Sequence, residues 1–401
     1  MFTKQKPTTI PITEIEQSAF CRTDETLDVK PLAEEFSASV RWQGIPSEYL
    51  HMDGQELTAR IRDARNLLGD RLTILGHHYQ REEVIQFADV RGDSFKLAQY
   101  AASLPYAEFI VFCGVHFMAE TADILSNANQ KVILPNITAG CSMADMASTE
   151  DVIDCWNDLE NILGQGGIVP ITYMNSTADI KALCGRNNGI VCTSSNATKV
   201  MEWAFQKGER VLFLPDQHLG RNTALKLGIA LEDMVVWNPF KNLGGNTEDS
   251  IKNAKIILWQ GHCSVHTRFN VNQINKAREK YPDVNILVHP ECTMDVVQAA
   301  DYNGSTEYII KTVTESPPGS KWGIGTEISL VSRLAKENPD KLIFCIDSVV
   351  CPCSTMYRIH PAYLLWVIEE LINDNIINQV LVNDDTAEQS HIALERMLSI
   401  V

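Results

Sequence analysis

The sequence predicts an α/β protein with three homologous αβα units, each containing a parallel sheet, around a pseudo-threefold axis that holds the active site at its centre. Three observations predict this fold. Short apolar runs alternate with helical segments, similar motifs recur three times, and each copy contains a lysine-initiated strand followed by a cysteine. Strands that alternate with helices in this way form parallel β-α-β units.

Length and composition limit the classes of protein to consider. The chain has 401 residues, more than one hydrophobic core usually serves, so we expect several domains or a repeat architecture. Hydrophobic residues at 45% and charged residues at 21% exclude extensive disorder. The net charge of −17 argues against a nucleic-acid or anionic-membrane surface. Neither a membrane-spanning stretch nor a secretory signal is found, so we expect a cytoplasmic protein.

Internal similarity sets the expected domain boundaries. Segment 72–94 resembles 285–306, with 169–195 as a weaker third copy, and 112–125 resembles 213–227. An insertion at about 228–252, rich in turn-forming residues, lengthens the second repeat. The expected organisation is an N-terminal arm at 1–52, repeats at 53–147, 148–268 and 269–373, and a C-terminal tail at 374–401.

One cysteine falls at the same point of each repeat. Each copy has a strand that begins with lysine: KVIL (131–134), KIIL (255–258) and KLIF (341–344). Cys141 follows the lysine of the first strand by ten residues, Cys263 follows that of the second by eight, and Cys351 follows that of the third by ten. Because ligand groups emerge where parallel strands end, we expect the three thiolates to converge. Three protein ligands leave one metal position open, as in a catalytic site. Zinc tolerates three cysteines, but a [4Fe-4S] cluster with one open iron suits them better.

A neighbouring cysteine makes the third position ambiguous. Cys353 lies two residues after Cys351 in the segment CPCSTM, and Pro352 between them allows either side chain to face the axis. The register of the repeats favours Cys351. The odd total of eleven cysteines argues against a disulfide framework. We expect the remaining seven to be packing residues: Cys21, Cys113, Cys155, Cys184, Cys192, Cys292 and Cys345.

Polar residues follow the first strand of each repeat, where unpaired buried polar groups would be costly in a simple core. As a ring facing one axis they form an acid/base lining, and they are His77, Tyr79, Tyr173, Asn175, His289 and Glu291. A hydroxyl-rich position follows in each repeat, at Ser94, Ser194 and Thr306. These hydroxyls stand at helix starts, where they act as N-caps or bind an anion such as a phosphate or carboxylate. His266, three residues after Cys263, is a candidate for the same cavity.

At these residues the sequence resembles the quinolinate synthase family, the iron–sulfur enzymes of bacterial and plastid de novo NAD synthesis. The resemblance runs from about residue 53 to about 358. It is carried by GHHYQ (76–80), GDS (92–94), AGCSMAD (139–145), YMNS (173–176), CTSSNA (192–197), LPDQHLGRN (214–222), WQGHCSVH (259–266), HPEC (289–292), NGST (303–306) and CPCSTM (351–356). Cys-Pro-Cys-Ser replaces the family's more usual Cys-Pro-Asn-Met at 351–354.

The resemblance implies an enzyme that condenses iminoaspartate with dihydroxyacetone phosphate to quinolinate, losing phosphate and water. It implies a [4Fe-4S] cluster on Cys141, Cys263 and Cys351 whose open iron acts as a Lewis acid. Tyr79 and Glu291, with His77, would be catalytic. The implied substrate-binding residues are His77, Ser94, Tyr173, Asn175, Ser194, His266, His289, Glu291 and Thr306. A functional link to an L-aspartate-oxidising enzyme is also implied, and the chain is expected to be a monomer or homodimer.

Two other functions use the same features. A hydro-lyase of the aconitase kind would use the open iron on a different hydroxy acid. An iron–sulfur sensor would report oxygen or iron to a partner, but sensing gives no use for a ring of acid/base groups. The fingerprints of ATP and dinucleotide binding, GxxxxGK[ST] and GxGxxG before a helix, do not occur.

Overall fold

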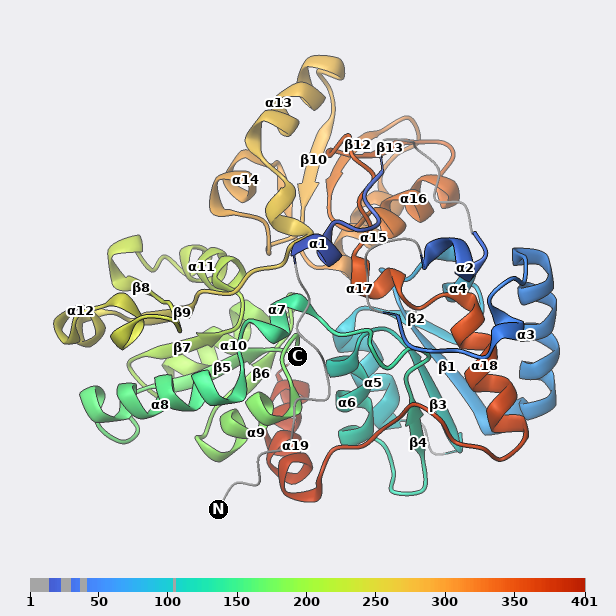
Figure 1. Cartoon of the computed structure of the whole chain (residues 1–401). Helices are drawn as coiled ribbons and strands as arrows, with labels where there is room; N and C mark the ends of the chain where they lie inside the picture. Colours follow the sequence, from blue (N-terminus) through green and yellow to red (C-terminus); the bar gives the residue numbers. More distant parts are fainter. Residues whose placement is uncertain (1–13, 23–29, 37–41, 104–105, 401) are drawn as a thin grey trace.

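The computed structural model describes residues 14–22, 30–36, 42–103 and 106–400. Three separate sheets, all parallel apart from one short edge strand, are flanked by helices and form three lobes around a common centre (Figure 1). The predicted α/β fold class is confirmed. Among the described residues, no helix is long and apolar enough to cross a membrane.

The first lobe contains a five-stranded sheet in the order β14-β4-β3-β1-β2. Its strands are β1 (Leu72–His77), β2 (Val90–Gly92), β3 (Phe109–Cys113), β4 (Lys131–Ile133) and β14 (Gln379–Val380), and β14 pairs antiparallel with β4. The helices are α3 (Gly54–Leu68), η2 (Gly69–Arg71), α4 (Glu82–Ile85), α5 (Ser94–Ser103), α6 (His116–Leu125) and α7 (Ser142–Asp145). The inner strands β1 and β3 are almost wholly buried and mostly apolar, as parallel strands covered by helices on both faces must be.

The second lobe has the order β6-β5-β7-β9-β8. Its strands are β5 (Val169–Tyr173), β6 (Ile190–Cys192), β7 (Val211–Leu214), β8 (Met234–Trp237) and β9 (Ile256–Trp259). Its helices are α8 (Thr149–Leu163), α9 (Ala178–Arg186), α10 (Ala197–Phe205), α11 (Gln217–Lys226), η3 (Leu231–Asp233), η4 (Asn242–Gly245), α12 (Glu248–Asn253) and η5 (His266–Arg268). The insertion at 228–252 is part of the sheet, because it supplies the edge strand β8, which pairs with β9.

The third lobe has the order β11-β10-β12-β13. Its strands are β10 (Asn285–Val288), β11 (Tyr302–Asn303), β12 (Lys321–Gly325) and β13 (Leu342–Cys345). The helices are α13 (Val271–Lys280), α14 (Met294–Ala299), α15 (Thr306–Glu315) and α16 (Ile328–Glu337). Counted within each lobe, the four shared strands follow the same order, second, first, third, fourth, so the topology repeats three times as the sequence similarity does.

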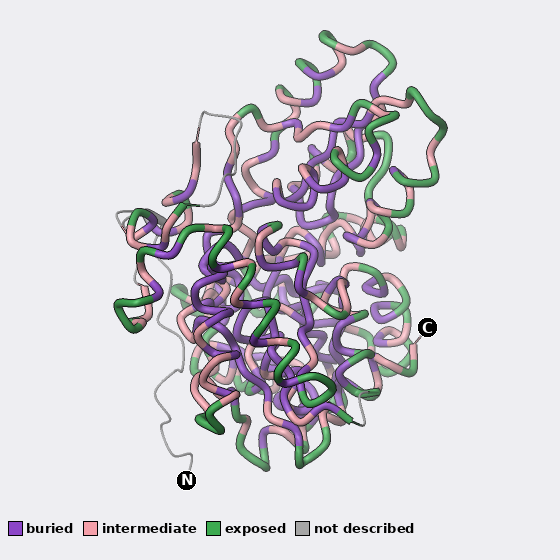
Figure 2. Tube along the Cα trace, turned by 90° about the vertical axis from the view of Figure 1, so that its right-hand side faces the viewer, coloured by how far each residue is buried: buried purple, intermediate pink, exposed green. Residues whose placement is uncertain are grey.

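The two ends of the chain join lobes together. The N-terminal arm contributes α1 (Glu14–Gln17), α2 (Leu32–Glu35) and η1 (Ser47–Tyr49), and α17 (Ser354–Tyr357) and α18 (Pro361–Ile372) follow the third lobe. Helix α18, expected within the third repeat, packs against α3 of the first lobe. The tail helix α19 (Asp384–Ser399) packs against α9 of the second lobe. Figure 2 shows the buried segments running through the interior, with the exposed residues on the outer loops.

Candidate functional site

A cavity lies where the three lobes meet, and residues of all three line it. This is the expected position, because the carboxyl ends of parallel strands carry ligand-binding groups. Each of the polar residues predicted from the strand ends lines the cavity: His77, Tyr79, Tyr173, Asn175, His289 and Glu291. Asn175 Oδ1 is buried without a hydrogen-bond partner among the described residues, so its amide is available to a ligand.

Glu291 is the centre of a buried hydrogen-bond network. Tyr173 donates its phenol proton to Glu291 Oε1 at 2.6 Å, and His266 Nδ1 lies 2.7 Å from Glu291 Oε2. The ring of His289 stacks on His266 with centroids 4.5 Å apart. His266, a candidate from its distance to Cys263, thus joins the polar ring. Two repeats supply this network, since His266 belongs to the second and Glu291 to the third.

Burial fixes the protonation states of these groups. Burial raises the pKa of Tyr79 and of Tyr173 well above 10, so both are neutral phenols. Burial alone would raise the pKa of Glu291, but His266 beside it and the hydrogen bonds from His266 and Tyr173 outweigh burial and hold that pKa below its usual value. Burial lowers the pKa of His289 to about 3, so its imidazole is neutral at neutral pH. The polar ring therefore contains neutral phenols and the neutral imidazole of His289 beside the ionised carboxylate of Glu291.

The hydroxyl-rich positions also meet at the cavity. Ser94 begins α5, Ser194 lies just before α10, and Thr306 begins α15; all three residues line the cavity. Free N–H groups at a helix start attract anions, and a hydroxyl adds a further donor. His289 Nε2 lies 3.3 Å from Ser194 Oγ, which joins this set to the polar ring.

Three cysteines line the cavity, one from each repeat: Cys141, Cys263 and Cys353. All three occupy the same local turn. Their backbone carbonyls accept a hydrogen bond from the amide four residues later, at 3.0, 3.1 and 2.9 Å respectively. The thiols also lie close enough that Cys141 and Cys353 each raise the pKa of Cys263. Three mutually close, cavity-facing sulfurs are a donor set that suits a soft metal or an iron–sulfur cluster.

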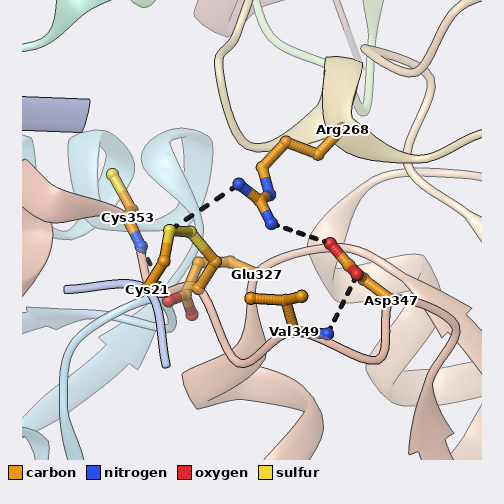
Figure 3. Close-up of a disulfide and its surroundings, with 7 residues drawn as sticks. Cys21, Arg268, Glu327, Asp347, Val349 and Cys353 are labelled. Atoms are coloured by element: carbon orange, nitrogen blue, oxygen red, sulfur yellow. Dashed lines mark hydrogen bonds and ion pairs between the residues drawn. A yellow bond between two sulfur atoms is a disulfide. The ribbon is translucent and has the colours of Figure 1, made fainter. Parts of the chain in front are cut away.

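Cys351, the preferred third residue in the sequence analysis, does not line this cavity. Its sulfur is bonded to Cys21 of the N-terminal arm (Figure 3), so neither cysteine is a free packing thiol and the expected absence of disulfides is wrong for this pair. Cys351 lies two residues before the cavity cysteine of its repeat. The residues at the same position in the first and second repeats are Ala139 and Gly261. The shared turn, not the distance from the lysine, determines which cysteine lines the cavity, and in the third repeat this is Cys353 and not Cys351.

The other cysteines behave as expected of packing residues. Cys113, Cys155, Cys184, Cys192 and Cys292 are buried and Cys345 is partly buried, and burial raises the pKa of each thiol. One ligand atom from each of Cys263, His266 and Glu291 lies within 4.8 Å of the other two, which is close enough for these residues to hold one metal ion. His266 and Glu291 are, however, already bound to each other in the polar network.

Sequence reasoning missed two residues of the site. Thr326 and Glu327 follow β12 directly; Thr326 contacts the polar ring, and Glu327 contacts the loop of Cys353. The signal was present, because Thr-Glu is a polar pair after a buried strand. The predicted site residues follow the first, second and fourth shared strands of each repeat, whereas Thr326 and Glu327 follow the third.

Similarity to known proteins extends over most of the chain. The model of the family described as Quinolinate synthetase A protein matches residues 59–399. The chain is 59% identical to the quinolinate synthase of Corynebacterium glutamicum, over 90% of this chain and 92% of that protein. It is 56% identical to the quinolinate synthase of Streptomyces coelicolor, over 86% and 88% of the two chains, and 53% identical to that of Geobacillus thermodenitrificans, over 89% and 96%. The chain therefore belongs to the quinolinate synthetase A protein family.

Proposed function

We propose that this protein is a quinolinate synthase that condenses iminoaspartate with dihydroxyacetone phosphate, releasing phosphate and water, in NAD biosynthesis. The observation that carries the proposal is the convergence of Cys141, Cys263 and Cys353 beside a ring of acid/base groups. Iminoaspartate is an oxidation product of aspartate, so a functional link to an L-aspartate-oxidising enzyme follows from the substrate.

The three cavity cysteines would hold a [4Fe-4S] cluster. Bound there, it supplies a Lewis acid through the iron that has no protein ligand. Each cysteine begins a tight turn, and backbone N–H groups of that turn favour the thiolate: those of Met143 and Ala144 for Cys141, and that of His266 for Cys263. Such N–H groups stabilise the negative charge that a metal-bound sulfur carries.

The anionic groups of the substrates match the hydroxyl-rich positions. Iminoaspartate carries two carboxylates and dihydroxyacetone phosphate carries a phosphate. Ser94 and Thr306 begin α5 and α15, Ser194 lies just before α10, and all three residues line the cavity. In a protein of net charge −17, such local donors explain how an anion binds without a basic surface.

Proton transfer falls to the polar ring. Ring closure requires protons to leave carbon and nitrogen and to reach the departing oxygens. The ionised Glu291 is the group that accepts a proton, and the neutral phenol of Tyr79 is a donor to a leaving oxygen. The neutral imidazoles of His77 and His289 can orient substrate oxygens from opposite repeats.

The test is an anaerobic assay of the reconstituted protein with both substrates, with quinolinate quantified by chromatography. Formation of quinolinate that needs both substrates is the expected result. Dehydration of a hydroxy acid without any pyridine product would instead indicate a hydro-lyase. No turnover of any substrate by a protein with a complete cluster would favour a sensor.

A further inference from the structure

A side chain of the second lobe holds the backbone on both sides of Glu291, which belongs to the third lobe. Asn222 of α11 donates from Nδ2 to the carbonyl oxygens of Pro290 and Cys292, at 2.9 Å in each case. These two carbonyls belong to the residues immediately before and after Glu291. Asn222 therefore fixes the chain that carries this carboxylate through bonds to the backbone.

Arg333 makes the same arrangement at Tyr79. It lies in α16 of the third lobe and is 6% exposed. Its guanidinium donates to the carbonyl oxygens of His78 and Gln80, the second at 3.4 Å. These carbonyls flank Tyr79, which belongs to the first lobe. A guanidinium is a rigid fork of donors, so one side chain can hold two acceptors at once.

Asn222 and Arg333 occupy the same place in their repeats. Asn222 lies eight residues after Leu214, the last residue of β7, and Arg333 lies eight residues after Gly325, the last residue of β12. Both strands are the third of the four shared strands of their lobe. The helix after the third strand of one lobe thus reaches the loop after the first strand of the next lobe.

The contact between the first and second lobes is built differently, so the fold does not require such a donor. Helix α6 of the first lobe carries Glu120, whose Oε2 accepts a hydrogen bond from the amide of the first residue of α9 at 3.0 Å. In the loop before α9, the carbonyl of Ser176 accepts instead from Lys181 of the same lobe. The two loops held by donors of a neighbouring lobe are therefore those of Tyr79 and Glu291.

We propose that Asn222 and Arg333 are positioning residues that set the directions of Glu291 and Tyr79 by holding the carbonyls next to them. The inference rests on the proposed function, in which these two groups move protons. They stand on loops of different lobes, so their relative position depends on how the lobes meet. A displacement of about 1 Å in a reacting group can cost roughly 100-fold in rate. Hydrogen bonds across the lobe boundary fix each loop against such a displacement.

Two substitutions at each position test the proposal. Asn222→Leu has a similar size without the donors, and Asn222→Ser is a milder change that is too short to reach the carbonyls. Arg333→Met removes the guanidinium, and Arg333→Lys keeps the charge but not the fork of donors.

Two control variants separate the carbonyl contacts from other effects. Asn246→Leu is matched to the Asn222 variants, because Asn246 also donates from Nδ2 to two backbone carbonyls, those of Val236 and Leu243, but within its own lobe. Glu82→Gln removes the partner of Arg333 in an ion pair at 3.5 Å and leaves the guanidinium in place. Neither Asn246 nor Glu82 lines the cavity.

Amide hydrogen exchange, followed by mass spectrometry on anaerobically reconstituted protein, tests the contacts without turnover. The amides of Gln80 and Cys292 are hydrogen-bonded within their own loops, so they exchange when those loops open.

We expect each variant to loosen a loop in the lobe next to its own. Both Asn222 variants should speed exchange at residues 289–292, and Arg333→Met should speed it at 77–81. The rise should be about fivefold, the factor that corresponds to one typical hydrogen bond. Arg333→Lys should lie between Arg333→Met and the parent, and the two control variants should leave both loops unchanged.

Turnover should fall in the same variants that loosen a loop. We expect kcat to fall by about 10–100-fold in Asn222→Leu and Arg333→Met, with KM, iron and sulfide unchanged, because a displaced reacting group slows the chemical step. Arg333→Lys should recover part of this loss, and Asn246→Leu and Glu82→Gln should keep the kcat of the parent.

The outcomes separate this proposal from the proposed function. Unchanged exchange in both loops, or exchange that rises equally along the whole chain, would overturn the positioning role even if quinolinate is made. The same holds for a kcat within about threefold of the parent in variants whose loops have loosened. A parent that makes no quinolinate overturns the function, and the exchange pattern still decides whether Asn222 and Arg333 hold these loops.

Discussion

Glu327 Oε1 accepts a hydrogen bond from the backbone amide of Cys353 at 3.2 Å (Figure 3). The other oxygen of the same carboxylate caps α16 by accepting from the amide of Ser329 at 2.8 Å. Glu327 thus ties the end of β12 to the loop of the third cavity cysteine. In the second repeat Asp216 occupies the equivalent position and caps α11; burial raises the pKa of this carboxyl well above its usual value, and the backbone amide of Cys263 is one of the hydrogen-bond donors that oppose this shift.

Replacement of Glu327 should therefore affect metal binding as well as stability. We expect Glu327→Ala to lose roughly 1–3 kcal/mol of unfolding free energy and to bind less iron and sulfide, because the Cys353 amide loses its acceptor. Asp53→Ala is the control: Asp53 caps α3 through the amides of Gln55 and Glu56 and is remote from the cavity. It should cost about 1 kcal/mol and leave the iron content unchanged. Equal iron content in both variants would contradict a role of Glu327 toward Cys353.

The identity of the third cysteine can be decided by metal analysis. We expect Cys141→Ala, Cys263→Ala and Cys353→Ala each to lose the four-iron cluster after anaerobic reconstitution, because each removes one of the cavity sulfurs. Cys351→Ala should retain it, because its sulfur faces Cys21 instead. Iron, sulfide and visible absorption provide the measurement. A complete cluster in Cys353→Ala, together with its loss in Cys351→Ala, would restore the assignment made from the sequence.

The fold could be predicted because its causes are local and repeated. Apolar strands, helix starts and similar motifs recur at matched spacing, and parallel strands place the residues after them at one edge. That rule was enough to place His77, Tyr173 and Glu291 on one cavity, whereas their chemical roles stay predictions. It reached those residues because each lies at a strand end or within two or three residues of one.

The sequence favoured Cys351 because spacing was counted from the start of the strand. Counted from strand ends, Cys141 and Cys353 each follow by eight residues, after Ile133 and Cys345, but Cys263 follows Trp259 by four, so only the shared turn marks all three cysteines. Strand β13 begins one residue later than its lysine suggested, and a strand end is not visible in the sequence. The disulfide to Cys21 was equally hidden, since it joins residues 330 positions apart.

Glu291 carries the clearest prediction about turnover. Glu291→Gln keeps the size of the side chain but removes the charge that accepts a proton and that pairs with His266. We expect turnover to fall by roughly 10²–10⁴-fold with a complete cluster. Glu248→Gln is the control, because Glu248 is an exposed carboxylate of α12 that does not line the cavity. Unchanged quinolinate formation by Glu291→Gln would refute the role of Glu291 as proton acceptor.

The buried ion pair between the N-terminal arm and the first lobe predicts a dependence of stability on pH. Arg81 Nη2 lies 2.8 Å from Glu35 Oε1, and both side chains are almost fully buried. Burial alone would raise the pKa of Glu35, but the charge and hydrogen bonds of Arg81 lower it below its usual value. Stability from this pair is therefore complete above the unfolded pKa of about 4.3 and is lost as the pH falls through the lower folded pKa.

Glu35→Gln should reveal this contribution in urea unfolding. At pH 7 the variant leaves Arg81 buried without its charged partner, which typically costs roughly 3–5 kcal/mol. As the pH falls below about 4, the parent itself protonates Glu35, so the difference between the two proteins should shrink. Glu56→Gln, which removes only a half-exposed pair with Arg60, should differ little from the parent at any pH. A difference for Glu35→Gln that stays constant from pH 7 to about pH 3 would show that Glu35 is not ionised through its pair with Arg81.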